Sequence, residues 1–111
     1  SYKNYGHIYR TGDSVTIKVR GWLANNVAYD AVRCPFTIPE GARPPLVDHE
    51  KYGSISDSTE SIVYNSGFCP GHADVITAIS ARPDGNIYLQ DMGGTVSNAW
   101  RQGSLTYTVR H

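Results

Sequence analysis

The sequence has few charged residues and no excess of either sign. Ten Lys and Arg residues balance ten Asp and Glu residues, and charged residues make up 18% of the 111 positions, below the roughly 25% of an average protein. A nucleic-acid-binding domain would carry a basic stripe, and because none is visible we expect no nucleic-acid partner. No apolar run approaches the ~18 residues of a membrane-spanning helix, so we expect no membrane insertion.

Cysteine is also scarce. The two cysteines, Cys34 and Cys69, do not define the disulfide framework of a small secreted domain. A bridge between them would close a loop with an entropy term of roughly 4 kcal/mol, so a disulfide stays open as an alternative. We expect two free, buried thiols, which weakly favours a reducing compartment for folding.

A chain of 111 residues suffices for one domain with one modest core. It begins at Ser1 without Met, and we expect either a trimmed chain or a fragment of something longer. Residues 1–5 are polar and are expected to be a lead-in or the remnant of a stalk. Residues 6–111 are expected to form a single β domain.

Two segments show the alternation of apolar and polar residues that is typical of a half-buried strand. The first, 14–23, places Trp22 on its polar face, either covered by a neighbouring chain or closing the edge of the sheet. The second, 104–109, is expected to be the closing strand. The residues predicted to face inward are Val15, Ile17, Val19, Gly21 and Leu23 in the first segment, and Leu105, Tyr107 and Val109 in the second.

A hairpin is predicted over 73–89, with its turn at Pro83-Asp84-Gly85-Asn86. Proline fixes φ, aspartate tolerates turn geometry, and glycine supplies a positive φ at no steric cost. The flanking residues are β-branched or aromatic, so they are expected to pair as antiparallel strands at the centre of a sheet.

Shorter strands are expected at 7–9, 34–38, 46–52 and 61–64, and Pro35 favours either an edge position or a strand start for the second of these. The segments 39–45, 53–59, 65–71 and 91–100 are expected to be loops. About eight strands at a spacing of 8–12 residues, with no substantial helix, indicate an all-β fold. We therefore predict an antiparallel β-sandwich or barrel of jelly-roll-like type.

A saccharide site needs an aromatic platform and a few planar polar groups. Trp100 and Arg101 supply both beside the Gly-rich segment 91–99, and Tyr88 and Asp91 lie at its other end. We therefore predict that these four residues line a shallow saccharide-binding crevice. The alternative is that Trp100 anchors the predicted loop onto the core.

Metal and catalytic sites are weakly indicated. Cys69, His72 and Asp74 form half a metal site, and 48–50 (Asp-His-Glu) form another cluster, but zinc normally needs four ligands at paired short spacings. No Ser or Cys lies in a nucleophile motif, and neither Glu40 nor Glu60 has a predictable partner. We expect no metal, no cofactor and no enzymatic activity.

The order of these features resembles a known family. The bend at 38–45 (Ile-Pro-Glu-Gly-Ala-Arg-Pro-Pro) follows the alternating strand 14–23, and it precedes the hairpin at 83–87 and the closing strand 105–109. Over nearly the whole chain this resembles the C-terminal head domain of phage tail and baseplate receptor-binding proteins, as in siphophages of Gram-positive hosts. The region 48–71 has no counterpart in that pattern.

The resemblance implies a homotrimer of β heads at a tail tip or baseplate of the virion, in contact with other tail or baseplate proteins. Such heads bind host cell-wall saccharides or phosphopolysaccharides, often between subunits. An Arg shortly before the last strand recurs in them, and Arg101 holds that position here. The alternative from another class is a structural domain that trimerises or caps a viral fibre and binds no ligand.

Overall fold

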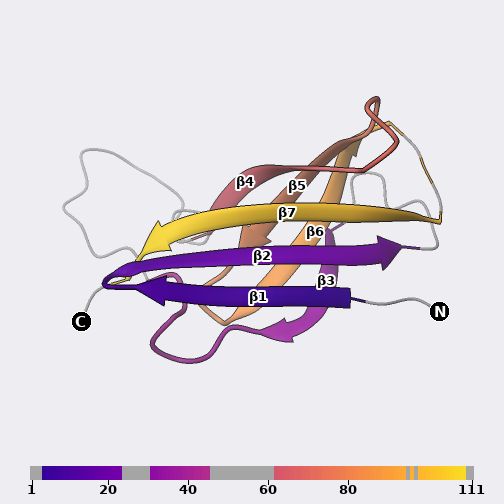
Figure 1. Cartoon of the computed structure of the whole chain (residues 1–111). Coiled ribbons are helices and arrows are strands. Elements are labelled where there is room, and N and C mark those ends of the chain that lie inside the picture. The colour runs from indigo at the N-terminus through magenta and orange to yellow at the C-terminus, as the bar shows by residue number, and fades with distance from the viewer. Residues whose placement is uncertain (1–3, 24–30, 46–61, 95, 97, 110–111) are drawn as a thin grey trace, which may run out of the picture.

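The computed structural model describes residues 4–23, 31–45, 62–94, 96 and 98–109 of the chain, and within these ranges the regular structure is entirely β (Figure 1). Seven strands are described: β1 Asn4–Thr11, β2 Ser14–Leu23, β3 Ala31–Thr37, β4 Val63–Phe68, β5 Ile76–Ala81, β6 Asn86–Gly93 and β7 Ala99–Thr108.

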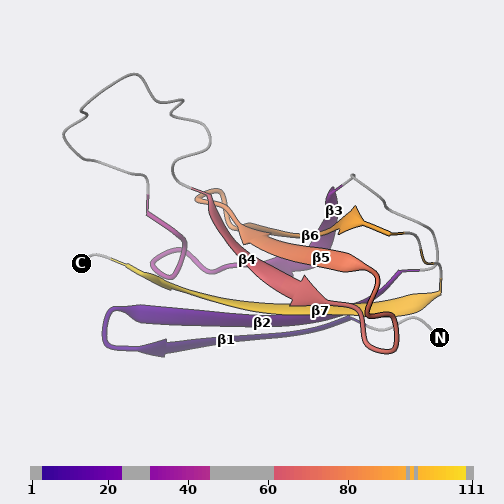
Figure 2. The same ribbon diagram turned by 90° about the horizontal axis from the view of Figure 1, so that it is seen from above.

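All seven strands belong to one antiparallel sheet in the order β1-β2-β7-β4-β5-β6-β3. The sheet folds back on itself, so that β1, β2 and β7 form one layer and β4, β5, β6 and β3 form the other (Figure 2). The result is a nearly closed, barrel-like structure. The predicted all-β fold is confirmed, with seven strands among the described residues instead of about eight; the strand expected at 46–52 lies outside those residues.

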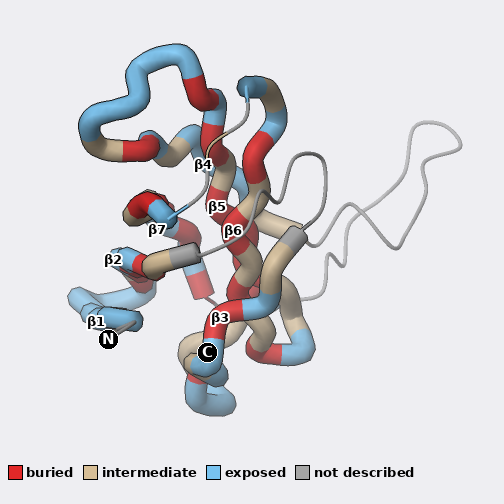
Figure 3. Tube along the Cα trace, turned by 90° about the vertical axis from the view of Figure 1, so that its right-hand side faces the viewer, coloured by how far each residue is buried: buried red, intermediate tan, exposed pale blue. Residues whose placement is uncertain are grey.

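The predicted alternation of β2 and β7 builds the core. Val15, Ile17 and Leu105 are at most 2% exposed and face the opposite layer. That layer contributes Ile79, Ile87 and Leu89 to the same cluster. Figure 3 shows buried segments along β5 and β6, whereas β1 is exposed over almost its whole length. The inward parity of both segments is confirmed for the side chains that the structure describes.

The hairpin between β5 and β6 is confirmed, with β5 beginning at Ile76. Gly85 has φ of 92°, and its N–H donates to the carbonyl of Arg82 at 2.9 Å. The Asp84 carboxylate accepts a hydrogen bond from the Asn86 N–H at 2.9 Å, which closes the turn. The Ile38 N–H donates to the Gly85 carbonyl at 2.8 Å, so the irregular bend at 39–45 starts beside this turn.

β3 is the last strand in the sheet order and pairs only with β6 among the described strands, so Pro35 lies on an edge as predicted. The other edge is β1, which pairs with β2. Phe36 of β3 lies against Gly6 of β1, where an added Cβ would be 2.9 Å from its ring. This contact brings the two edges of the sheet close together.

Two of the predicted loops are wrong. β4 continues through Phe68, and the segment expected to be a long loop from Asp91 is mostly strand, because β6 runs to Gly93 and β7 begins at Ala99. Glycines and outward-facing polar residues gave these segments a loop-like composition. Pairing with neighbouring strands supplies the backbone hydrogen bonds that keep them extended.

The two layers join where β4 meets β7 over two residue pairs, Gly67 with Gly103 and Phe68 with Gln102. A Cβ at Gly67 would lie 2.5 Å from the Gln102 carbonyl oxygen. A Cβ at Gly103 would lie 2.9 Å from Cγ2 of Ile79 in the opposite layer. Glycine at both positions therefore permits the close approach that folds the sheet.

Both cysteines are free and buried, as predicted. Cys34 belongs to the main core, where burial raises the pKa of its thiol to about 12. Burial likewise raises the pKa of Tyr107 to about 12, and its hydroxyl donates a hydrogen bond to the Ala42 carbonyl. Both groups are thus held in the protonated, neutral form.

Alkaline pH should destabilise the domain through these two groups. Their folded pKa values of about 12 lie above the ordinary values of 9.0 and 10.0, so the unfolded chain releases protons that the folded chain retains. Their contribution to stability is complete below pH 9 and is lost as the pH rises towards 12. We expect the free energy of unfolding in urea to fall by at least roughly 1 kcal/mol from about pH 8 to about pH 11.

The double variant Cys34→Ala/Tyr107→Phe serves as the control, because it lacks both titrating groups. Its free energy of unfolding should change less over the same pH range. Equal pH dependence in the two proteins would contradict the assignment.

Candidate functional site

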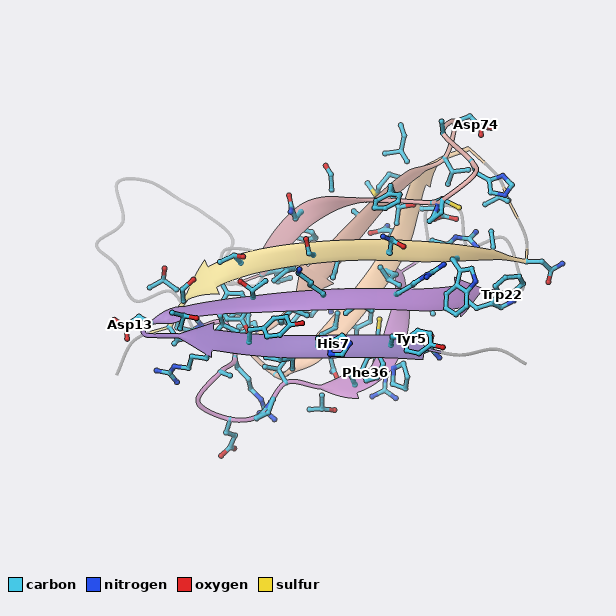
Figure 4. The ribbon with its side chains drawn as sticks, in the orientation of Figure 1. Tyr5, His7, Asp13, Trp22, Phe36 and Asp74 are labelled. Atoms are coloured by element: carbon cyan, nitrogen blue, oxygen red, sulfur yellow. The ribbon has the colours of Figure 1, made fainter. Side chains whose placement is uncertain are left out.

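An open groove runs over the outer face of the β1-β2-β7 layer, beside the junction with β4. Its volume is about 620 Å³. Figure 4 shows two of its residues, Tyr5 and His7, on β1. The lining residues are Tyr5, His7, Lys18, Val19, Arg20, Ser66, Gly67, Phe68, Gln102, Gly103 and Ser104.

The sheet register brings these side chains together. Tyr5 is paired with Arg20, and Arg20 with Gln102, which in turn is paired with Phe68. Two residues along each strand, a second row contains His7, Lys18 and Ser104. Residues two apart on a strand face the same side, so both rows project outward from the sheet. The polar face predicted for 14–23 thus forms the centre of the groove.

The groove is basic. Three of its lining residues are His7, Lys18 and Arg20, and none of the described residues that line it is Asp or Glu. The whole chain has a formal net charge of zero, so positive charge is concentrated here. Gln102 and two serines add amide and hydroxyl groups that can donate or accept hydrogen bonds.

Aromatic side chains are present at the β4 and β1 sides of the groove. Phe68 is 53% exposed and Tyr5 is 47% exposed. Large exposed aromatic rings offer apolar area to a ligand without prior rearrangement of the core. The groove therefore combines apolar surface, planar hydrogen-bonding groups and positive charge.

Three rings form an aromatic cluster, which we define as Tyr5, Trp22 and Trp100, at the end of this face. Trp100 stacks on Tyr5 with 5.8 Å between ring centroids and meets Trp22 edge-on at 5.6 Å. The Arg20 guanidinium carbon lies 4.5 Å from the Trp100 ring centroid, within the range of a cation–π interaction. Trp100 thus contacts two groove residues, Tyr5 and Arg20, and Trp22 packs at the strand end.

The four residues predicted to line one crevice do not do so. Asp91 and Arg101 are both 0% exposed. Trp100 faces outward from β7, and Tyr88 lies on the other layer, where the Arg82 guanidinium carbon is 4.1 Å from its ring centroid. Trp100 and Arg101 are adjacent on a strand and therefore point to opposite faces. The prediction failed because it placed Trp100 in a loop and Arg101 directly beside that loop, outside any strand.

Asp91 and Arg101 instead form a buried ion pair inside the barrel. Nη2 of Arg101 lies 2.8 Å from Oδ2 of Asp91, and Nε lies 3.3 Å from Oδ1. Thr77 donates a hydrogen bond to the same carboxylate at 3.4 Å. Two further guanidinium N–H groups donate to the carbonyls of Val96 and Ala99 at 2.7 and 3.0 Å. Such a pair holds its own elements together and presents nothing to a surface ligand.

The half metal site suggested by the sequence is not assembled. Within the described ranges, no three His, Cys, Asp or Glu side chains gather closely enough to hold a metal ion. Cys69 packs with Val75 and Ala99 in a small second cluster, and burial raises the pKa of its thiol. The Asp-His-Glu cluster at 48–50 lies outside the described residues.

Sequence reasoning missed the groove residues of β1, β2 and β4. The one available signal was the polar face of 14–23, which carries Lys18 and Arg20 on the same side as Trp22. The contributions of Tyr5 and Phe68 depend on which strands are neighbours, and local patterns do not contain that information.

No protein-family model matches the chain, and a search of curated proteins found no match either. In the described part of the chain, no helix has the length and apolarity required to cross a membrane. The functional proposal therefore depends on the chain's own residues.

Removing one partner of the ion pair should destabilise the domain strongly. Arg101→Met leaves the Asp91 carboxylate buried without its guanidinium, which should lower the free energy of unfolding by about 3–5 kcal/mol. The double variant Asp91→Leu/Arg101→Met removes both charges and should lie within about 1–2 kcal/mol of the wild type. Urea unfolding at neutral pH measures both, and a single variant as stable as the double variant would argue against a paired role.

Proposed function

We propose that this domain is an adhesin head that binds a cell-surface saccharide in the groove between β1, β2, β7 and β4. The observation that carries the proposal is the lining itself: exposed Tyr5 and Phe68 beside Gln102 and two serines, with three basic residues and no carboxylate among the lining residues that the structure describes. Aromatic rings pack against the apolar faces of sugars, and amides and hydroxyls bond their hydroxyl groups.

The charge of the groove favours a saccharide that carries phosphate or carboxylate groups. His7, Lys18 and Ser104 form one row of donors across three strands. In the neighbouring row, the Arg20 guanidinium carbon lies 4.5 Å from the Trp100 ring centroid, and a guanidinium in a cation–π contact can still donate hydrogen bonds at its edge. An anionic polymer such as a phosphopolysaccharide would meet positive charge along the groove.

The sequence resemblance gives this proposal its biological setting, the head of a phage tail or baseplate receptor-binding protein on the virion. The all-β, nearly closed barrel and the irregular bend at 39–45 are consistent with that setting. A homotrimer would present three grooves, and the avidity of three weak sites would compensate for low affinity at each.

Groove variants should bind less saccharide without unfolding. We expect Tyr5→Ala, Phe68→Ala and Lys18→Ala each to lower the affinity by about tenfold or more, equivalent to ~1.4 kcal/mol. A glycan array with labelled domain identifies the saccharide, and calorimetric titration then measures each variant. The melting temperature should stay close to that of the wild type, because all three side chains are exposed.

Two matched substitutions control for nonspecific effects. Tyr64 is 57% exposed on β4 and does not line the groove, so Tyr64→Ala should bind as the wild type does. Arg33 is exposed on β3, and Arg33→Ala removes a positive charge away from the groove. Binding that is equally weak in controls and groove variants, or unaffected in all of them, would reject the groove as the site.

A structural role in trimerisation is the second candidate, and one surface favours it. Ile76 and Met92 are 62% and 47% exposed, and Ile76 is paired with Phe68 in the sheet. Exposed apolar side chains at one region mark an interaction site. A subunit interface would remove this apolar area from water.

Light scattering tests the assembly directly. We expect three times the chain mass for the wild type, and a mass shifted towards the monomer for Ile76→Lys, because a buried unpaired ammonium opposes association. Tyr64→Lys places the same charge on an exposed position of β4 as a control. A wild-type monomer at high micromolar concentration would refute the trimer, whereas an intact trimer without saccharide binding would favour the purely structural role.

A further inference from the structure

A strained residue directly precedes β7. Asn98 has φ of 53°, and it is the one non-glycine residue with positive φ in the described ranges. Asparagine reaches this left-handed region more readily than most residues, but it does so at a cost that the surroundings must offset. Asn98 lies two positions before Trp100. The interactions that stabilise the backbone conformation of Asn98 therefore also determine the direction in which β7 begins.

The buried Arg101 guanidinium provides that hold. Its Nη2 donates to the Val96 carbonyl at 2.7 Å, and its Nη1 donates to the Ala99 carbonyl at 3.0 Å, on either side of Asn98. The same guanidinium is fixed to Asp91 of β6, whose carboxylate also accepts from Thr77 of β5. One side chain thus ties the start of β7 to two strands of the opposite layer.

Trp100 lies between two of these fixed points. The carbonyl of Ala99 before it and the side chain of Arg101 after it are both held inside the barrel. Trp100 must therefore project from the outer face, where it contacts Trp22, Tyr5 and Arg20. The last two of these line the groove.

We propose that Asp91 and Arg101 are a positioning pair for the binding face. They fix the backbone on both sides of Asn98 and thereby the orientation of Trp100, which in turn supports Tyr5 and Arg20. The effect on the orientation of the rings does not depend on any ligand. The effect on ligand affinity depends on the saccharide-binding function proposed above.

The chemistry of the Asp91–Arg101 ion pair fits a positioning role better than apolar residues would. A buried ion pair can be replaced by well-packed apolar residues with little loss of stability. Apolar side chains, however, cannot donate to the carbonyls of Val96 and Ala99. Arginine combines a fork that pairs with one carboxylate and further donors at fixed angles, an arrangement that lysine cannot reproduce.

The test uses the double variant Asp91→Leu/Arg101→Met, which keeps apolar volume and removes the donors. The chain has two tryptophans, so an exciton couplet in its circular dichroism reports how Trp22 and Trp100 lie relative to each other. We expect the couplet to lose at least half its amplitude while the β-sheet signal remains. Titration with glucose 1-phosphate, which offers a sugar face and a phosphate, should show about a tenfold loss of affinity.

Val109→Ala is the matched control, because it removes buried apolar atoms near the other end of β7 and leaves the Arg101 donors intact. It should lower the melting temperature yet retain both the couplet and the affinity. Arg101→Lys keeps the charge but not the full set of donors, so it should weaken the couplet even if the double variant does not fold.

An unchanged couplet in Arg101→Lys and in a folded double variant would overturn the proposal, as would an equal loss in Val109→Ala. If the wild type does not bind glucose 1-phosphate, the proposed anionic ligand is in doubt, and the couplet still decides whether the pair positions the rings.

Discussion

The architecture depends on one close contact between backbones, that of Gly67 in β4 with Gly103 in β7. There the sheet turns from one layer into the other, and a Cβ on Gly67 would fall 2.5 Å from a backbone carbonyl oxygen. The fold lets β5 and β6 cover β2 and β7, which creates the core. It also brings Phe68 beside Gln102, so the same contact that closes the barrel builds one side of the groove.

In the β1-β2-β7 layer, the side chains that build the core and the side chains proposed to bind a ligand lie on opposite faces of the strands. On β2, Val15 and Ile17 are completely buried, whereas Lys18 and Arg20 project outward into the groove. Since alternate residues serve different purposes, the outer face can change its chemistry with little effect on the core. The exception is Trp100, whose outward direction is set by the buried donors of the next residue.

Local patterns predicted the parts of the fold that local chemistry determines. The alternation of 14–23 and the turn at Asp84-Gly85 each contain their own physical cause, and both are present in the structure. The candidate site could not be predicted in this way, because Tyr5 and Phe68 are brought together only by the lateral order of four strands. Adjacency in sequence was misleading for Trp100 and Arg101, since strand geometry sends neighbours to opposite faces. The extent of β7 was hidden by glycine and polar residues that looked like a loop.

The positive charge of Arg101 is compensated inside the barrel and does not contribute to the groove. Asp91 neutralises it inside the barrel, where the two contacts of a bidentate pair, at 2.8 and 3.3 Å, join the two charged groups. It therefore adds little to the surface potential, whereas Lys18 and Arg20 in the groove contribute positive charge there. Salt at physiological ionic strength screens the field of an exposed charge over a distance of about 8 Å. A chain with no net charge can therefore still attract an anionic ligand to a locally positive surface. At that range the positive groups that line the groove would dominate its interaction with an anionic ligand.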